Sequence, residues 1–104
     1  MGKIDEESAD FPSDRTLVVR VRTGDPRAFE LLVRRHLRIA HAVARTTLNG
    51  DADEVDDVVQ ESFIVALQKI DECRDPARFR AWLLTIVRNR AHNQREYLVS
   101  CNSD

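Results

Sequence analysis

Residues that interrupt helices are scarce: the 104-residue sequence contains only three glycines and three prolines. Uninterrupted stretches free of both residues run for more than twenty positions. Because glycine and proline are the strongest breakers of regular structure, this scarcity predicts an all-α fold. With 42% hydrophobic residues, a chain of this length can form one modest core. We therefore expect a compact bundle of three to four helices.

Cysteines and long apolar runs are also scarce. The two cysteines, Cys73 and Cys101, lie 28 positions apart and form no C-x-x-C motif. No apolar run approaches the twenty residues that a membrane-spanning helix needs, and no signal-peptide pattern is present. These absences predict a cytoplasmic protein with reduced thiols.

Motifs that carry catalysis or bind metals are missing. There is no G-x-S-x-G, P-loop or H-E-x-x-H pattern, and the histidines and cysteines do not fall at zinc spacings. A calcium-binding EF-hand loop starting at Asp51 would need other residues than Val55, Asp56 and Ser62 at those positions. We predict no enzymatic activity, no metal and no cofactor.

The net charge of −2 conceals a strong segregation of charge along the chain. Residues 15–48 carry eight arginines against two acidic residues, whereas residues 49–72 carry eight acidic residues against one lysine. Residues 73–104 are basic again. Fourteen of the sixteen cations are arginine, whose planar guanidinium favours bidentate contacts to phosphate or carboxylate.

Turn and capping residues predict four helices. The first starts after Ser13 or Asp14 and ends at Gly24; the second opens with Asp25 and Pro26 and ends at 49–51. The third spans about 53–72, and the fourth starts at 75–76 and runs to about residue 98. We expect residues 1–12 to form a flexible tail, residues 13–98 the bundle, and residues 99–104 a C-terminal tail.

Helical periodicity assigns faces to the second helix. Its predicted core face includes a histidine, His36, which we expect to be buried and hydrogen-bonded rather than a ligand. The full predicted core face is Phe29, Leu32, Val33, His36, Leu37, Ala40, Val43 and Ala44. The opposite face, which is either solvated or a polyanion contact, holds Arg27, Arg34, Arg38, His41 and Arg45.

The third helix combines an apolar face with an outward row of carboxylates. We expect Val55, Val59, Phe63, Ala66 and Ile70 to face inward, flanked by Val58, Val65 and Leu67. Asp53, Asp57 and Glu61 follow one another at i, i+4 spacing, where like charges repel by roughly 0.2–0.5 kcal/mol per pair. Helix stability alone does not favour this row. Ile64 within the same polar stripe is either a scattered surface isoleucine or the apolar anchor of a protein-binding patch.

The fourth helix changes character along its length. Phe79, Trp82, Leu83, Ile86 and Val87 form an apolar stripe, and we expect the helix to leave the core near Arg88. Phe79 and Trp82 are predicted to be core residues rather than base-stacking platforms. The surface of the helix and the preceding loop offers donors suited to phosphates and base edges.

From about residue 25 to 95, the sequence resembles domain 2 of bacterial RNA polymerase sigma factors of the extracytoplasmic-function (ECF) group of the sigma-70 family. The resemblance rests on "GDPRAFELLVRRH", "DDVVQESFIVAL" and "FRAWLLTIVRNRA" in the family's order and spacing. It implies that the acidic helix docks on the clamp-helix coiled coil of the polymerase's largest subunit. The residues implied in that contact are Asp57, Gln60, Glu61 and Ile64.

The resemblance also implies that the fourth helix and its preceding loop recognise the promoter's minus-ten element. Sigma factors of this kind capture an unpaired base of the non-template strand in a loop-lined pocket while basic residues follow the backbone. The DNA-binding candidates are Arg74, Arg78, Arg80, Arg88, Asn89, His92 and Asn93. Anti-sigma factors bind the same domain in the family, so such a factor is a further implied partner.

The family pattern is not matched throughout. Members usually carry an aromatic residue near the position of Cys73, and Arg90 replaces a residue that is commonly apolar. The second DNA-binding domain of these factors, a helix-turn-helix, is absent from the sequence. The competing hypothesis is a small helical adaptor whose acidic and basic faces serve only protein partners.

Overall fold

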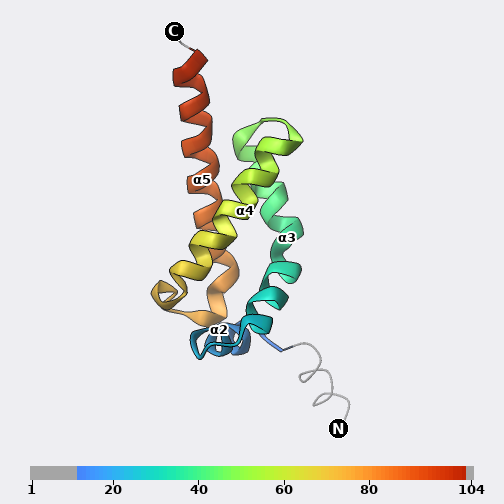
Figure 1. Ribbon diagram of the computed structural model, residues 1–104, viewed down its shortest axis with the longest axis vertical. Helices are drawn as coiled ribbons and strands as arrows, with labels where there is room; N and C mark the ends of the chain where they lie inside the picture. Colours follow the sequence, from blue (N-terminus) through green and yellow to red (C-terminus); the bar gives the residue numbers. More distant parts are fainter. Residues whose placement is uncertain (1–11, 103–104) are drawn as a thin grey trace.

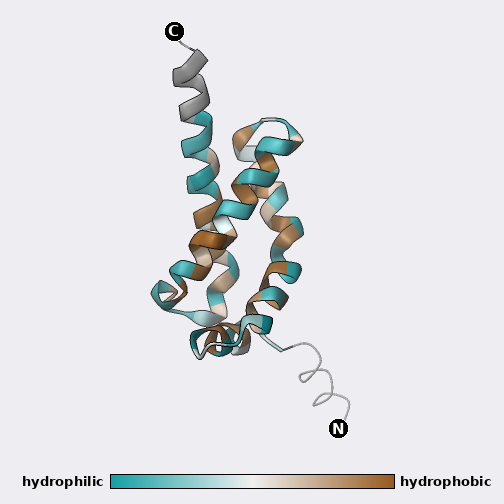
Figure 2. Cartoon of the chain, in the orientation of Figure 1, coloured by the Kyte–Doolittle hydropathy of each residue, from teal (hydrophilic) through white to brown (hydrophobic). Residues whose placement is uncertain are grey.

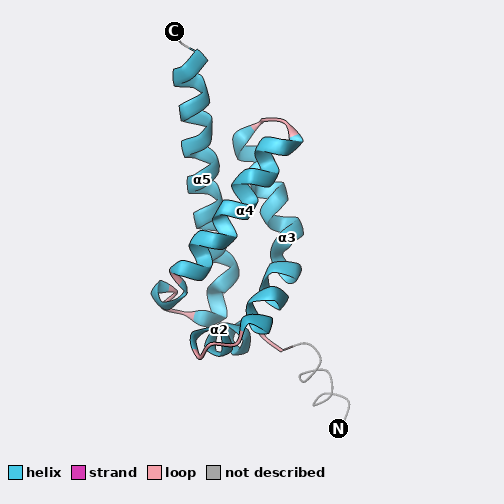
Figure 3. Ribbon diagram, in the orientation of Figure 1, coloured by secondary structure: helices cyan, strands magenta, loops and turns pink. Residues whose placement is uncertain are grey.

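The computed structural model describes the chain from residue 12 to residue 102, with side chains up to residue 95. Four α-helices make up most of this part (Figure 1), namely α2 (Asp14–Arg22), α3 (Pro26–Leu48), α4 (Ala52–Gln68) and α5 (Phe79–Asn102). Two single turns of 3₁₀-helix, η1 (Ile70–Glu72) and η2 (Pro76–Arg78), connect α4 to α5. The described residues contain no strand (Figure 3), which confirms the predicted all-α class.

Local capping chemistry sets the helix starts. The Ser13 hydroxyl accepts a hydrogen bond from the backbone N–H of Thr16 at the start of α2. Asp25 caps α3, with Pro26 in the first turn as expected. Asp51 and Glu54 form a reciprocal capping box at the start of α4, so Glu54 has a specific capping role beyond favouring the helix dipole.

Two predicted helix ends differ from the structure. The α-helical part of the acidic segment stops at Gln68, and η1 replaces the final turn that was expected to reach residue 72. Helix α5 continues to Asn102, beyond the expected end near residue 98. A 3₁₀ turn tightens the chain before it reverses toward α5, which positional periodicity does not encode.

Helices α3, α4 and α5 each contact the other two, and α2 lies across one end of this three-helix bundle (Figure 1). The C-terminal turns of α5 project beyond the bundle at the opposite end. Apolar and hydrophilic residues alternate along the helices (Figure 2), and the described residues that are buried are apolar with the exceptions of His36 and Ser62. The core combines residues from every helix, including Leu17, Leu32, Val59, Phe79 and Leu83.

His36 is buried as predicted, and its Nε2 lies 2.9 Å from Oδ2 of Asp14. Two leucines predicted to face inward are instead exposed: Leu37 on α3 is 40% exposed and Leu67 on α4 is 44% exposed. Both lie at the edge of their helix's apolar arc, where the neighbouring helix does not reach. Periodicity assigns the arc, but the crossing of the helices decides how much of it is covered.

The packed part of α5 is longer than predicted. Ala91 is fully buried, so the helix leaves the core one turn beyond Arg88. Arg90 does not shorten the packed segment, because its guanidinium extends to Glu61 on α4. The apolar stem of a long side chain can pack over the interface between two helices while its charged end stays near water.

Candidate functional site

The outward row of α4 is exposed as the sequence predicted. Asp57, Gln60, Glu61 and Ile64 are all exposed, with Ile64 at 56%. Their spacing of three, one and three residues places them on one face over two helical turns. The structure therefore gathers all four residues of the predicted docking row on one surface of α4.

Ile64 is not an isolated apolar side chain. It lines a groove between α3 and α4 together with Leu37, Val33 and Phe63. His41 and Asp56 close one part of this groove, with His41 Nε2 2.9 Å from Asp56 Oδ1. An apolar strip beside a polar row is the composition of a protein-binding surface. Leu37 was not predicted as part of this surface, because helical periodicity assigns it to the core.

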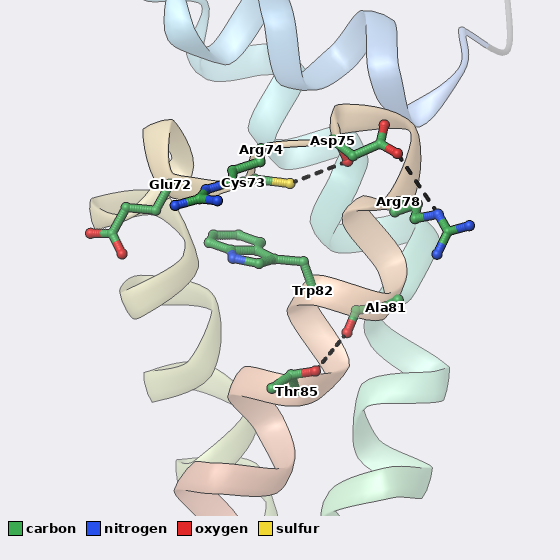
Figure 4. A pocket seen from close by; sticks show the side chains of 8 residues that line it. All are labelled: Glu72, Cys73, Arg74, Asp75, Arg78, Ala81, Trp82 and Thr85. Carbon is green, nitrogen blue, oxygen red and sulfur yellow. Dashed lines mark hydrogen bonds and ion pairs between the residues drawn. The ribbon is translucent and has the colours of Figure 1, made fainter.

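Two of the predicted DNA-binding residues, Arg74 and Arg78, lie at the connection between α4 and α5. An open pocket of about 350 Å³ lies between the η1–η2 loop and the start of α5 (Figure 4). Its lining residues are Glu72, Cys73, Arg74, Asp75, Arg78, Ala81, Trp82 and Thr85. The structure thus brings Arg74 and Arg78 to the same pocket.

Trp82 is half-buried and combines two environments. One part of its ring packs on the core residue Phe79, with ring centroids 5.8 Å apart. The rest of the indole lines the pocket, between the loop and Thr85 (Figure 4). The prediction that Trp82 is simply a core residue was therefore incomplete. The aromatic wall of this pocket comes from α5, while Cys73 in the loop is buried.

The other candidates follow the pocket along α5. Arg80 and Arg88 line an adjoining hollow that shares Arg78 and Thr85 with the pocket. Asn89 lines a hollow on the other side of Trp82. His92 and Asn93 are exposed on the next turn of α5. All seven candidates therefore lie on the surface of α5 and its preceding loop.

The arginines around the pocket differ in whether they form an ion pair. Asp75 caps η2 by accepting from the N–H of Ala77, and its other oxygen lies 3.7 Å from Nε of Arg78. Within the described residues, Arg74, Arg80 and Arg88 form no ion pair. Their guanidinium groups are therefore available to phosphate oxygens.

Helix α2 holds this loop in place through Arg22. Arg22 donates hydrogen bonds to the backbone carbonyls of Ile70 and Cys73, and its Nε lies 3.7 Å from Oδ1 of Asp71. This role of Arg22 was not predicted, because the contact joins residues about fifty positions apart. Burial raises the pKa of the Cys73 thiol, although the nearby Arg22 charge opposes this effect. Cys73 is therefore a neutral, structural residue of the loop.

Two negative results concern the described residues only. Between residues 12 and 102, no helix is both long and apolar enough to cross a membrane. In the same part of the chain, no three histidine, cysteine, aspartate or glutamate side chains are grouped so that they could hold a metal ion.

The sequence matches a known protein family. The family model for sigma-70 region 2 matches residues 32–97. The ECF RNA polymerase sigma-E factors of Salmonella typhimurium (strain LT2) and Escherichia coli (strain K12) are 45% and 44% identical to the chain over 89 residues. These alignments cover 85% of the chain and 44% of each relative.

The sigma-E factor of Haemophilus influenzae is 42% identical over 82 residues, which cover 78% of the chain and 42% of that relative. The chain thus spans less than half the length of the curated relatives that it matches. No solved structure matches it significantly. On the family match and these identities, the chain belongs to the sigma-70 region 2 family, in its extracytoplasmic-function group.

Proposed function

We propose that this chain is the part of an ECF sigma factor that docks on core RNA polymerase and recognises and melts the promoter's minus-ten element. The observation that carries the proposal is the separation of two surfaces on one bundle. An acidic row with an apolar groove lies on α4, and an arginine-lined pocket lies at the start of α5. The family match favours this function over a purely protein-binding adaptor.

The acidic surface serves the polymerase. Asp57 and Glu61 attract arginine or lysine side chains of the clamp helices, Gln60 adds hydrogen bonds, and Ile64 supplies an apolar anchor beside the groove. The like-charge repulsion along α4 is relieved when a cationic partner binds. An anti-sigma factor with a similar cationic helix would compete for this surface.

The pocket serves the non-template strand. Its volume of about 350 Å³ is sufficient for a nucleobase, and Trp82 offers an aromatic surface at its wall. Stacking on an aromatic side chain contributes about 1–3 kcal/mol per base, which offsets the cost of unstacking a base from the duplex. Arg74, Arg78, Arg80 and Arg88 bind the backbone, and Asn89, His92 and Asn93 supply donors for base edges.

Neither surface performs chemistry in this proposal. Transcription initiation factors of this family are not enzymes. The chain needs no cofactor, and its site of action is the cytoplasm, where core polymerase and DNA are found.

A selection experiment tests the proposal. Core RNA polymerase of Escherichia coli is mixed with the chain and a pool of single-stranded oligonucleotides with a randomised centre, and bound strands are sequenced. We expect the ternary complex to enrich one short sequence that polymerase alone does not enrich. Binding to polymerase without any enrichment would support the adaptor hypothesis instead, and no binding to polymerase would refute the proposed function.

A further inference from the structure

One ion pair connects the two proposed surfaces. Nη2 of Arg90 on α5 lies 3.2 Å from Oε1 of Glu61 on α4, and both side chains are close to half exposed. Glu61 is the one member of the acidic docking row that has an ion pair within the described residues; Asp57 has none. The docking row is therefore already partly neutralised by a residue of the same chain.

Arg90 also borders the DNA-binding side. It lines a hollow between α4 and α5 together with Asn89 and Trp82, which belong to the proposed DNA-binding surface. Gln68 and Lys69 add donors to this hollow, whereas Glu72 adds a carboxylate. The Arg90 guanidinium therefore lies in the same hollow as Asn89 of the proposed DNA-binding surface. It is also within ion-pair distance of Glu61 of the proposed polymerase-binding surface.

We propose that Arg90 is shared between the two surfaces, so that polymerase docking on Glu61 releases it to bind a backbone phosphate in this hollow. The inference rests on the proposed function, because Glu61 must meet a cationic partner. Once a partner cation takes over the Glu61 carboxylate, Arg90 loses its intramolecular attraction. Lys69 and Asn89 then share a phosphate with it, while Glu72 limits the strength of the site.

The coupling must be reciprocal. Polymerase and DNA each replace the same internal ion pair, so each ligand increases the affinity for the other by the same factor. Exposed ion pairs contribute little, so the expected effect is about two- to fivefold in affinity. Arg90 is accordingly a positioning residue that links the two binding events rather than a main source of affinity for either.

The first test needs no polymerase. Fluorescence anisotropy measures the Kd of a labelled 20-nucleotide oligo(dT) for the full chain and for Glu61→Gln. We expect Glu61→Gln to bind about two- to fivefold more tightly, because Arg90 is free, and its log Kd to depend more steeply on log salt by about 0.7, as for one added phosphate contact.

The matched control is Asp53→Asn. Asp53 lies two turns before Glu61 on the same face of α4, is exposed, and forms no ion pair within the described residues, so its replacement removes the same charge. If Asp53→Asn strengthens oligo(dT) binding as much as Glu61→Gln does, general charge explains the effect and the inference is wrong.

The second test includes the partner. Saturating core RNA polymerase should tighten oligo(dT) binding by the chain beyond the contribution of polymerase alone, and Arg90→Gln should reduce this gain by about two- to fivefold. Equal gains for the two proteins would overturn the inference while leaving the proposed function intact. If the unmodified chain fails to bind polymerase, the proposed function fails first.

Discussion

Asp14 and His36 join the first turn of α2 to the middle of α3. Oδ2 of Asp14 lies 2.9 Å from Nε2 of the buried His36, and Oδ1 lies 2.9 Å from Nη1 of Arg35. Because an ionised carboxylate only accepts hydrogen bonds, Nε2 of His36 carries a hydrogen and donates the hydrogen bond to Asp14. One side chain of α2 thus satisfies two donors of α3 and fixes the helix across the end of the bundle.

Replacing Asp14 by alanine should destabilise the fold by about 1–3 kcal/mol, since a buried imidazole N–H is left without an acceptor. Asp14→Asn keeps an acceptor oxygen and should lose less. Urea unfolding measures both. A loss for Asp14→Ala no larger than that for the exposed Asp53→Ala would contradict the structural role.

Removing the Arg22 side chain should loosen the loop that forms the pocket. Arg22→Ala deletes the donors to the carbonyls of Ile70 and Cys73, and charged hydrogen bonds of this kind contribute about 1.5–3 kcal/mol. We expect faster amide hydrogen exchange in residues 73–75 as well as lower stability. Arg20→Ala, on the exposed side of α2, is the control and should change neither quantity appreciably.

Substitutions in the docking row should affect binding but not folding. Asp57→Lys replaces attraction of a cationic partner by repulsion, and Ile64→Ser removes an exposed apolar anchor, so each should weaken binding to core polymerase by about tenfold or more. The thermal midpoint should change little because both side chains are exposed. Unchanged polymerase affinity in Asp57→Lys would refute the docking surface.

Substitutions in the proposed DNA-binding surface should change DNA binding in two distinct ways. Arg88→Ala should weaken binding of single-stranded DNA for all sequences and reduce the salt dependence by about 0.7, because it removes one phosphate contact. Asn89→Ala should instead change the base preference, since amide side chains recognise base edges. Competition between oligonucleotides of different sequence distinguishes the two effects. If both variants keep the affinity and the base preference of the original chain, this surface does not bind DNA.

The Cys73 thiol provides a pH-dependent prediction. Burial raises its pKa above the ordinary value of 9.0, so the folded state favours the neutral thiol. Its contribution to stability is complete below pH 9 and is lost as the pH rises through the folded-state pKa. In a Cys101→Ser background, the difference in unfolding free energy between the chain and Cys73→Ala should therefore decrease above pH 9. A constant difference up to pH 11 would contradict it.

The sequence alone determined much of this protein. Few glycines and prolines, together with capping residues at Ser13 or Asp14 and at Asp25, predicted the helices and the first two helix starts, because capping is a local interaction. The capping role of Asp51 emerged only in the structure. Periodicity separated the inward valines of α4 from its outward carboxylates. The same pattern predicted a buried His36, although not its acceptor on another helix.

Only the tertiary structure decided how the helix edges are used. Leu37 and Leu67 are exposed because the neighbouring helices do not cover them, and Leu37 thereby joins Ile64 in one groove. Arg22 reaches a loop about fifty positions away, and Arg90 reaches Glu61 across a helix junction. Such contacts depend on the packing angles and separations of helices, which arise from the whole core at once and which no local pattern encodes.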